Sequence, residues 1–255
     1  MTTLEKVINI FKKSKGKIRP PVVVSGPTGS GKTWNTNLLT EKYEIPMIKI
    51  NAAQLTKEGY TGMSLSKALV PLKKIGHKLN IVYVDEFCKL FLSSDDGGVP
   101  SDITIGVQNE FLDLLEAKTT RVMGDYGKYD IVKLENTLFI FSGAFNDTPI
   151  NNEKDLMTFG VKREFLGRIA VYMTYEAMSL EDMLGLVDKS ELLELYAGIQ
   201  GKKKLEARRI IKDTITKHYE ENFLGTRLIN NIIHRYFLEI KDVEKEEKTW
   251  GEYYV

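Results

Sequence analysis

One stretch, VSGPTGSGKT at positions 24–33, constrains the fold of this chain more than any other feature. It has the spacing Gly-x-x-x-x-Gly-Lys-Thr and lies between a short apolar run, PVVV, and a segment of helical character, KTWNTNLLTEKY. In such a loop, glycines let backbone N–H groups point at phosphate oxygens, the lysine reaches the outer phosphates, and the threonine hydroxyl binds magnesium. The sequence therefore predicts a strand, a loop and a helix that hold a nucleoside triphosphate. The predicted binding residues are Gly26, Pro27, Thr28, Gly29, Ser30, Gly31, Lys32 and Thr33.

A second apolar run ends in two acids, NIVYVDE at positions 80–86. A carboxylate at the end of such a strand can hold the magnesium ion, and a neighbouring one can polarise the attacking water. Taken alone, the two acids would be just as typical of a strand end followed by a helix cap. Beside the phosphate-binding loop, they predict hydrolysis of the triphosphate, with Asp85 as metal ligand and Glu86 as general base.

The order of the predicted elements indicates an α/β fold. Strands are expected at PVVVSG and at 46–51, 80–86 and 136–143, with helical patterns at 64–76 and 104–118, and this alternation predicts a mostly parallel sheet covered on both faces. From about residue 179 the chain shows amphipathic helices and no convincing strand. We expect a helix and basic turn at 1–20, an α/β domain at 21–176 and a small helical domain at 177–255.

Composition excludes several classes of protein. With 42% apolar and 28% charged residues, the chain is typical of a globular protein, and its net charge of +1 does not favour a nucleic-acid partner. The single cysteine, Cys88, excludes an intramolecular disulfide, and the three histidines have no zinc-site spacing. No apolar run is long enough for a signal peptide or a membrane span, so we expect a cytoplasmic protein without membrane contact.

Four further stretches resemble one family in sequence and order. They are LTKEGYTGMSLSKAL, GVQNEFLDLLEAKTTRV, GAF and FGVKREFLGRIAVYMTYEAMSLEDMLGLV. Together with the loop and the acid pair, they resemble the ClpX/HslU family of AAA+ unfoldases from residue 21 to about residue 240. The resemblance implies a P-loop ATPase that binds ATP and Mg²⁺, with a parallel five-stranded sheet and a C-terminal helical lid. It also implies a homo-oligomer, a hexameric ring, that acts on protein substrates.

The resemblance assigns roles to particular residues. The segment Gly59-Tyr60-Thr61-Gly62 matches the aromatic pore loop that grips a threaded polypeptide, and a tyrosine between glycines suits that task as a bulky group on a mobile backbone. Arg168 matches the arginine finger that reaches the nucleotide of a neighbouring subunit, and Arg227 matches the second sensor of nucleotide state. Without the resemblance, Tyr60 would be read as a packed turn residue and the two arginines as surface charges.

Two assignments stay open at this stage. The first sensor is expected at the end of the fourth strand, where FSGAFN offers Ser142 and, as the alternative, Asn146. The stretch RVMGDYGKYDIVKL alternates around two glycines and predicts a hairpin with Tyr126 at its tip. This hairpin is either a second pore loop or a plain surface hairpin.

The sequence also departs from the family. Only NDTPINNEKDLMT lies between GAF and FGVKREF, where the family carries a long loop that docks on a peptidase ring. The zinc-binding amino-terminal domain is not expected either, and a helix and basic turn replace the segment before the first strand that helps hold adenine in the family. We therefore expect no docking on a ClpP-type peptidase.

Two other functions remain as alternatives. An AAA+ protein acting on nucleic acid, such as a helicase loader or initiation factor, would use the basic turn Lys12, Lys13, Lys15, Lys17 and Arg19. Against this, both predicted pore loops carry mixed charge, whereas a channel for phosphates should be basic. The other alternative is a ring that serves as an ATP-switched scaffold, in which Tyr60 would be dispensable.

Overall fold

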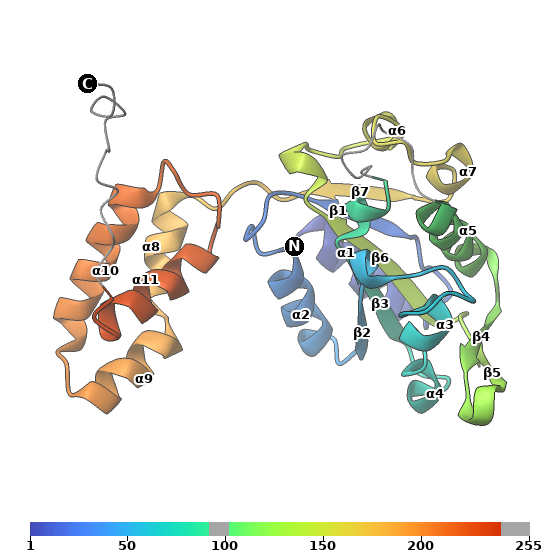
Figure 1. Ribbon diagram of the computed structural model, residues 1–255, viewed down its shortest axis with the longest axis horizontal. Coiled ribbons are helices and arrows are strands. Elements are labelled where there is room, and N and C mark those ends of the chain that lie inside the picture. The colour runs from blue at the N-terminus through green and yellow to red at the C-terminus, as the bar shows by residue number, and fades with distance from the viewer. Residues whose placement is uncertain (92–101, 241–255) are drawn as a thin grey trace, which may run out of the picture. The chain divides into compact units, whose positions relative to one another are not determined.

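The computed structural model describes residues 1–91 and 102–240, and the side chains of 102–104 are not described. The chain forms two compact units, Met1–Ala177 and Met178–Val255 (Figure 1). The first unit is an α/β domain, and the described part of the second unit contains helices only.

The first unit is built on a five-stranded parallel sheet with the order β2-β3-β6-β1-β7. Its strands are β1 (Val22–Ser25), β2 (Met47–Asn51), β3 (Asn80–Asp85), β6 (Thr137–Gly143) and β7 (Val171–Thr174). The four strands expected from the sequence are present, and β7 is a fifth strand that the pattern did not locate. The prediction of a parallel P-loop α/β fold is confirmed.

Both faces of the sheet are buried, as the apolar runs of its strands require. In the central strand β6, Phe139 and Phe141 enter one hydrophobic cluster and Leu138 and Ile140 enter the other. The second cluster also contains the buried side chains of the amino-terminal helix α1 (Thr3–Lys13). Figure 1 shows α1 beside the sheet on the same side as the helix that follows the phosphate-binding loop, α2 (Lys32–Lys42).

The opposite face of the sheet carries the remaining helices of this unit. They are α3 (Leu65–Ala68), α4 (Leu72–Ile75), α5 (Asp102–Glu116), α6 (Glu153–Met157) and α7 (Arg163–Leu166). The single helix expected at 64–76 is thus two short helices. The break falls at Pro71, which lacks an N–H for a continuous helix and instead precedes the first residue of α4.

A two-stranded antiparallel hairpin projects from this unit between α5 and β6, as the sequence predicts. Its strands are β4 (Thr119–Met123) and β5 (Tyr129–Lys133). Gly124 N–H donates to the Lys128 carbonyl over 2.7 Å and closes the turn. Tyr126 lies at the tip with a positive φ of 56° and is fully exposed.

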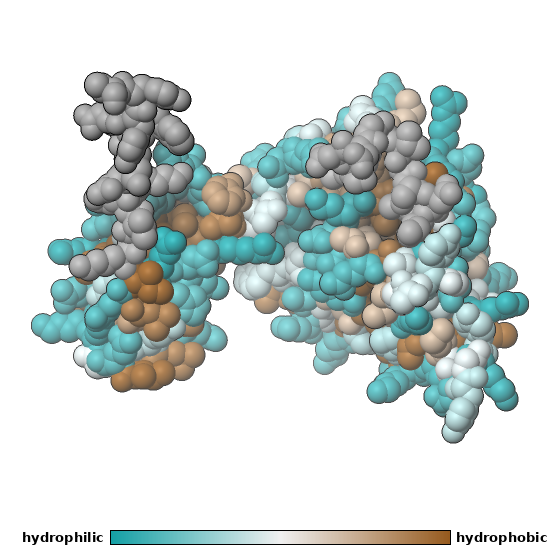
Figure 2. All heavy atoms as spheres, viewed as in Figure 1, coloured by the Kyte–Doolittle hydropathy of each residue, from teal (hydrophilic) through white to brown (hydrophobic). Residues whose placement is uncertain are grey.

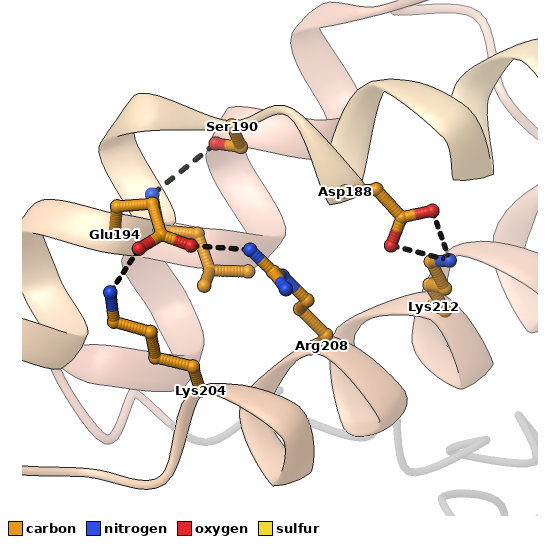
Figure 3. Close-up of polar contacts among 7 residues, drawn as sticks. Asp188, Ser190, Glu194, Lys204, Arg208 and Lys212 are labelled. Atoms are coloured by element: carbon orange, nitrogen blue, oxygen red, sulfur yellow. Dashed lines mark hydrogen bonds and ion pairs between the residues drawn. The ribbon is translucent and has the colours of Figure 1, made fainter.

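In its described part, residues 178–240, the second unit packs four helices around its own apolar core. They are α8 (Leu180–Asp188), α9 (Glu191–Gln200), α10 (Lys204–His218) and α11 (Arg227–Phe237). Ion pairs join the helices at the surface: Glu194 of α9 contacts Lys204 and Arg208 of α10, and Asp188 of α8 contacts Lys212 (Figure 3).

Apolar side chains also reach the surface of the helical unit, where brown patches are visible in Figure 2. Ile199, Leu205 and Phe223 are each more than four-fifths exposed. No helix in the described ranges is long and apolar enough to cross a membrane.

Candidate functional site

The loop between β1 and α2 has backbone angles that favour glycine. Gly26, Gly29 and Gly31 have φ angles of +141°, +74° and +89°. A Cβ atom on Gly26 would lie 2.3 Å from the carbonyl oxygen of Tyr175, so no larger residue fits there without moving the backbone. The glycines of the predicted motif are therefore required by the conformation of this loop.

Lys32 opens helix α2 and folds back over the loop. Its ammonium group donates to the carbonyl oxygens of Gly26 at 2.5 Å and Pro27 at 2.7 Å. The end of β1, directly before the loop, is fixed as well. Ser25 Oγ lies 2.8 Å from Thr174 Oγ1 of β7 and accepts from the Ile150 N–H at 3.0 Å. The result is a compact loop with a helix N-terminus and an ammonium group beside it, which is the arrangement that binds phosphate.

Thr33 is linked to the core of the sheet through Tyr83. The Thr33 hydroxyl lies 3.1 Å from the hydroxyl of Tyr83, which is fully buried on β3. Burial raises the pKa of Tyr83 to about 12, and contacts with Ser142 and Thr33 offset part of that effect. Tyr83 therefore stays neutral and can orient the hydroxyl predicted to bind magnesium.

Asp85 follows Tyr83 by two residues and so lies on the same face of the sheet, toward Thr33 and α2. Its Oδ1 accepts from the Glu86 N–H at 3.0 Å, and its Oδ2 lies 2.9 Å from the ammonium group of Lys49 on β2. Glu86 is exposed and adopts a left-handed conformation with φ of 55°. Such strain in a non-glycine residue is common at functional sites.

The residues at this edge of the sheet fit ATP and Mg²⁺. The loop offers N–H groups and an ammonium group to phosphates, and Gly26, Gly29 and Gly31 hold it in positive-φ conformations that other residues rarely adopt. Thr33 and Asp85 supply the hydroxyl and carboxylate oxygens that Mg²⁺ prefers.

Ser142 and Asn146, the two candidates for the first sensor, lie in different surroundings. Ser142 is fully buried on β6, and its hydroxyl has no hydrogen bond within normal geometry to a described residue. Ser142 therefore affects the pKa of Tyr83 because the two hydroxyl groups lie close together, although they form no hydrogen bond of normal geometry. Asn146 is exposed and has a φ of 52°. The structure therefore keeps both candidates, one beside Tyr83 and one on the surface.

The segment Gly59–Gly62 forms an exposed loop, in contrast to the phosphate-binding loop. Tyr60 is 53% exposed, and its N–H donates to the Lys57 carbonyl over 3.1 Å. At the base of the loop, the Thr56 N–H donates to the Met63 carbonyl over 2.9 Å. Gly59 and Gly62 have φ angles of +92° and +138°, so a tyrosine stands between two glycines in backbone conformations that other residues rarely adopt.

Arg168 follows helix α7 and is held within its own unit. Its guanidinium pairs with Glu116 at the end of α5, and Nη1 also donates to the carbonyl of Glu164. Its Nε is buried without a hydrogen-bond partner among the described residues. Arg227 is exposed and is the first residue of α11 in the other unit.

Several residues of this site escaped the sequence analysis. Tyr83 reads as one more apolar residue of a buried strand, and Lys49 as an ordinary polar residue of an edge strand. The only signal for Lys49 is alternation: Met47, Lys49 and Asn51 share one face of β2, and Asn51 pairs with Asp85. Tyr175 lies against Gly26 and Glu116 pairs with Arg168. Both contacts join positions distant in the sequence, so no local sequence pattern indicates them.

Comparison with known proteins agrees with this geometry. The chain is 27% identical over 206 residues to the ATP-dependent Clp protease ATP-binding subunit ClpX of Treponema denticola, an alignment that covers 64% of this chain and 50% of that protein. The chain thus spans about half the length of this relative. The profile of the AAA domain (Cdc48 subfamily) matches residues 20–172, which include the phosphate-binding loop, the acid pair and Arg168. The chain therefore belongs to the AAA family, Cdc48 subfamily, and is an ATP-hydrolysing P-loop protein.

Proposed function

We propose that this protein is an ATP-driven protein unfoldase or remodeller, which assembles as a hexameric ring and threads polypeptide past Tyr60. The observation that carries the proposal is the exposed loop with Tyr60 between two glycines of positive φ. An aromatic ring on such a backbone can press against side chains of any kind, because the contact is apolar and needs no fixed hydrogen bonds. The relative from Treponema denticola is named as a subunit of an ATP-dependent protease, which agrees with a protein substrate.

The hydrolysis step uses the edge of the sheet described above. The loop N–H groups and Lys32 bind and orient the phosphates of ATP, the substrate, while Thr33 and Asp85 hold Mg²⁺. The ion, when bound, neutralises charge on the phosphate oxygens. Glu86 accepts a proton from the attacking water and orients it, and its exposed position at the end of β3 leaves its carboxylate accessible to that water.

Arg168 completes the site of a neighbouring subunit in the ring. A guanidinium group there stabilises the charge that develops on the transferred phosphoryl group. Because Arg168 pairs with Glu116 inside its own subunit, it must exchange this partner for the neighbour's phosphate. Ser142 on β6, or Asn146 just after that strand, then senses the nucleotide, and Arg227 reports its state to the helical unit.

The hairpin tip with Tyr126 is the second surface that we assign to the polypeptide. Tyr126 is fully exposed, and the tip carries Asp125 and Lys128 beside it. This mixed charge suits a polypeptide of varied sequence better than a phosphate backbone. Because the segment that docks on a ClpP-type peptidase is missing between residues 146 and 158, we assign no such partner.

The test is steady-state ATP hydrolysis by the purified protein alone, with an unfolded polypeptide, and with single- or double-stranded DNA. We expect polypeptide to stimulate hydrolysis. The stimulation should be lost in Tyr60→Ala and retained in Tyr60→Phe, which keeps the aromatic side chain. Stimulation by DNA that is indifferent to Tyr60 would overturn the proposal in favour of a nucleic-acid substrate. Stimulation by neither would favour an ATP-switched scaffold.

A further inference from the structure

The loop at residues 56–63 and the β4–β5 hairpin meet at a single carboxylate, that of Glu58. Its Oε1 accepts a hydrogen bond from the Tyr129 hydroxyl at 2.9 Å, and its Oε2 accepts one from Ser66 Oγ at 2.7 Å. Tyr129 is the first residue of β5, directly after the turn that carries Tyr126. One side chain therefore joins the Tyr60 loop, the start of helix α3 and the hairpin.

The backbone of the same loop is fixed to helix α5. The Glu58 N–H donates to Glu110 Oε1 at 3.0 Å. One turn earlier on α5, Gly106 receives the aliphatic stem of Lys57, because a Cβ atom there would lie 2.6 Å from Lys57 Cδ. Glu58 is thus held on its main-chain side by α5, while its side chain reaches the hairpin.

The hairpin is also supported by packing, because β4 contacts α3 and two of the hairpin's side chains enter the main hydrophobic cluster. Val122 and Val132 are its buried residues among those described, whereas Ile131 is 74% exposed. A cavity of about 630 Å³, lined by Glu58, Arg121 and Tyr129 among others, lies beside it. The hairpin shows mainly pale and teal surface in Figure 2, so its outer end is not an apolar patch that packing would hold.

A second polar anchor lies farther along the hairpin, where Lys73 of α4 pairs with Asp130. That contact ties the hairpin to α4 but does not touch the Tyr60 loop. The Glu58–Tyr129 hydrogen bond, by contrast, connects the loop with the hairpin directly.

The charge state of Glu58 suits this role. Partial burial alone would raise the pKa of Glu58, but hydrogen bonds from nearby hydroxyl groups, that of Ser66 first, outweigh it and lower the pKa. The hydrogen bond to Glu58 in turn raises the pKa of Tyr129, so the hydroxyl keeps its proton. At neutral pH an ionised acceptor thus faces a neutral donor, which gives a stronger bond than two neutral groups.

Glu58 also directly precedes Gly59, which has a positive φ of 92°. No described atom lies within 4 Å of the position that a Cβ on Gly59 would take. The carboxylate is thus the last anchored side chain before Tyr60.

We propose that the Glu58–Tyr129 hydrogen bond makes the Tyr60 loop and the hairpin move as one unit, with both residues acting as positioning residues. The inference deepens the proposed function, and its importance for threading rests on that function. The physical coupling itself does not, because it is a property of the folded large unit.

Amide hydrogen exchange tests the coupling in both directions. Tyr129→Phe alters only the hairpin, yet we expect it to speed exchange at the loop amides of Glu58 and Tyr60 by about three- to tenfold. Glu58→Ala alters the loop and its hydrogen bond to Ser66 but no residue of the hairpin, yet it should speed exchange at Gly124 and Lys128 in the hairpin. These amides are hydrogen-bonded in the structure, so their exchange reports local opening.

Tyr43→Phe is the matched control, because it removes a tyrosine hydroxyl that donates to a different carboxylate, Glu5, in the same unit. It should leave exchange in both segments unchanged. The proposal is overturned if Tyr129→Phe and Glu58→Ala each speed exchange only in their own segment, or if the control produces the same changes.

The functional consequence is measured separately. We expect Tyr129→Phe to reduce stimulation of ATP hydrolysis by polypeptide about two- to fivefold without changing the basal rate, as a lost positioning contact would. If Tyr60→Ala retains full stimulation, the proposed function fails, while the exchange experiment still decides the coupling. If Tyr60→Ala abolishes stimulation and Tyr129→Phe has no effect on it, the positioning role fails and the proposed function stands.

Discussion

The two glycine-containing loops of the large unit, the phosphate-binding loop and the Tyr60 loop, are held in place in different ways. In the phosphate-binding loop, Gly26 is closed in by the backbone of Tyr175, and Lys32 bonds to the carbonyl oxygens of the loop itself. In the Tyr60 loop, Gly59 has open space around it and the tyrosine is half exposed. The first loop is held from within, whereas the second is held at its base by the Thr56–Met63 hydrogen bond and by the contacts of Glu58.

This difference follows from what each loop would bind. The phosphates of a nucleotide have the same shape in every cycle, so a rigid cradle loses no binding energy to reorganisation. A polypeptide presents a different side chain at each step, so its contact needs a loop that adapts. In the proposed function, external support through Glu58 would let such a loop move without losing its position.

Among the substitutions that test this comparison, removal of Arg168 should have the largest effect on the rate of ATP hydrolysis, and both loops should stay intact. We expect Arg168→Ala to lower the rate of ATP hydrolysis by about a thousandfold or more and to leave ATP binding in place. Mixed rings of this variant with Glu86→Gln subunits, which keep Arg168, should recover activity. A failure of such rings to recover, with assembly verified, would contradict a role across the subunit interface.

Glu86→Gln should be the next largest perturbation. The amide keeps the size of the side chain but accepts no proton, so we expect hydrolysis to fall by about a hundredfold or more with ATP affinity unchanged. Binding of a fluorescent ATP analogue and phosphate release measure the two effects. Hydrolysis near the normal rate would show that another group activates the water.

A matched pair of glycine substitutions compares the two loops directly. Gly26→Ala places a Cβ against the Tyr175 carbonyl, and we expect the free energy of unfolding to fall by about 3 kcal/mol, with loss of ATP affinity. Gly59→Ala meets no neighbour and carries only the strain of its positive φ, about 1–2 kcal/mol, with ATP affinity retained. Denaturant unfolding measures both values, and equal losses would mean that the two loops are equally constrained.

The smallest change is Tyr83→Phe, which removes the hydroxyl beside Thr33. We expect the Mg²⁺ concentration needed for half-maximal ATP binding to rise about three- to tenfold, because the Thr33 hydroxyl loses the group that orients it. Binding titrations at several Mg²⁺ concentrations measure this shift. An unchanged Mg²⁺ dependence would limit Tyr83 to packing.

Tyr83 also predicts a pH dependence. Its folded-state pKa of about 12 lies above the ordinary value of 10.0, so the folded state holds the proton more tightly. The corresponding stability, about 2–3 kcal/mol, is present below pH 10 and is lost as the pH rises toward 12. The free energy of unfolding of Tyr83→Phe should lack this component, and identical alkaline profiles of the two proteins would contradict it.

Local sequence predicted the features that depend on local chemistry. The phosphate-binding loop has its own strand, turn and helix start, so its position in the fold follows from adjacent residues. The antiparallel hairpin follows in the same way from alternation around two glycines. By contrast, β7 is four half-buried residues without a period, and the helix at 64–76 is divided by Pro71.

The contacts that sequence could not predict join distant positions. Glu58 and Tyr129 lie 71 positions apart, and their hydrogen bond depends on how the hairpin lies beside α3. Lys49 reaches Asp85 only because β2 pairs with β3 in a particular register. In the sequence Tyr83 looks like an ordinary core residue, but in the fold its hydroxyl lies 3.1 Å from that of Thr33, 50 positions away.

The most direct test of the central claim is ATP-dependent unfolding of a folded fluorescent protein that carries an unstructured tail. The account predicts that the wild-type protein abolishes the fluorescence when ATP is hydrolysed, that Glu86→Gln and Tyr60→Ala do not, and that Tyr60→Phe does. Fluorescence that persists with the wild-type protein, or that Tyr60→Ala removes equally fast, would contradict threading past Tyr60.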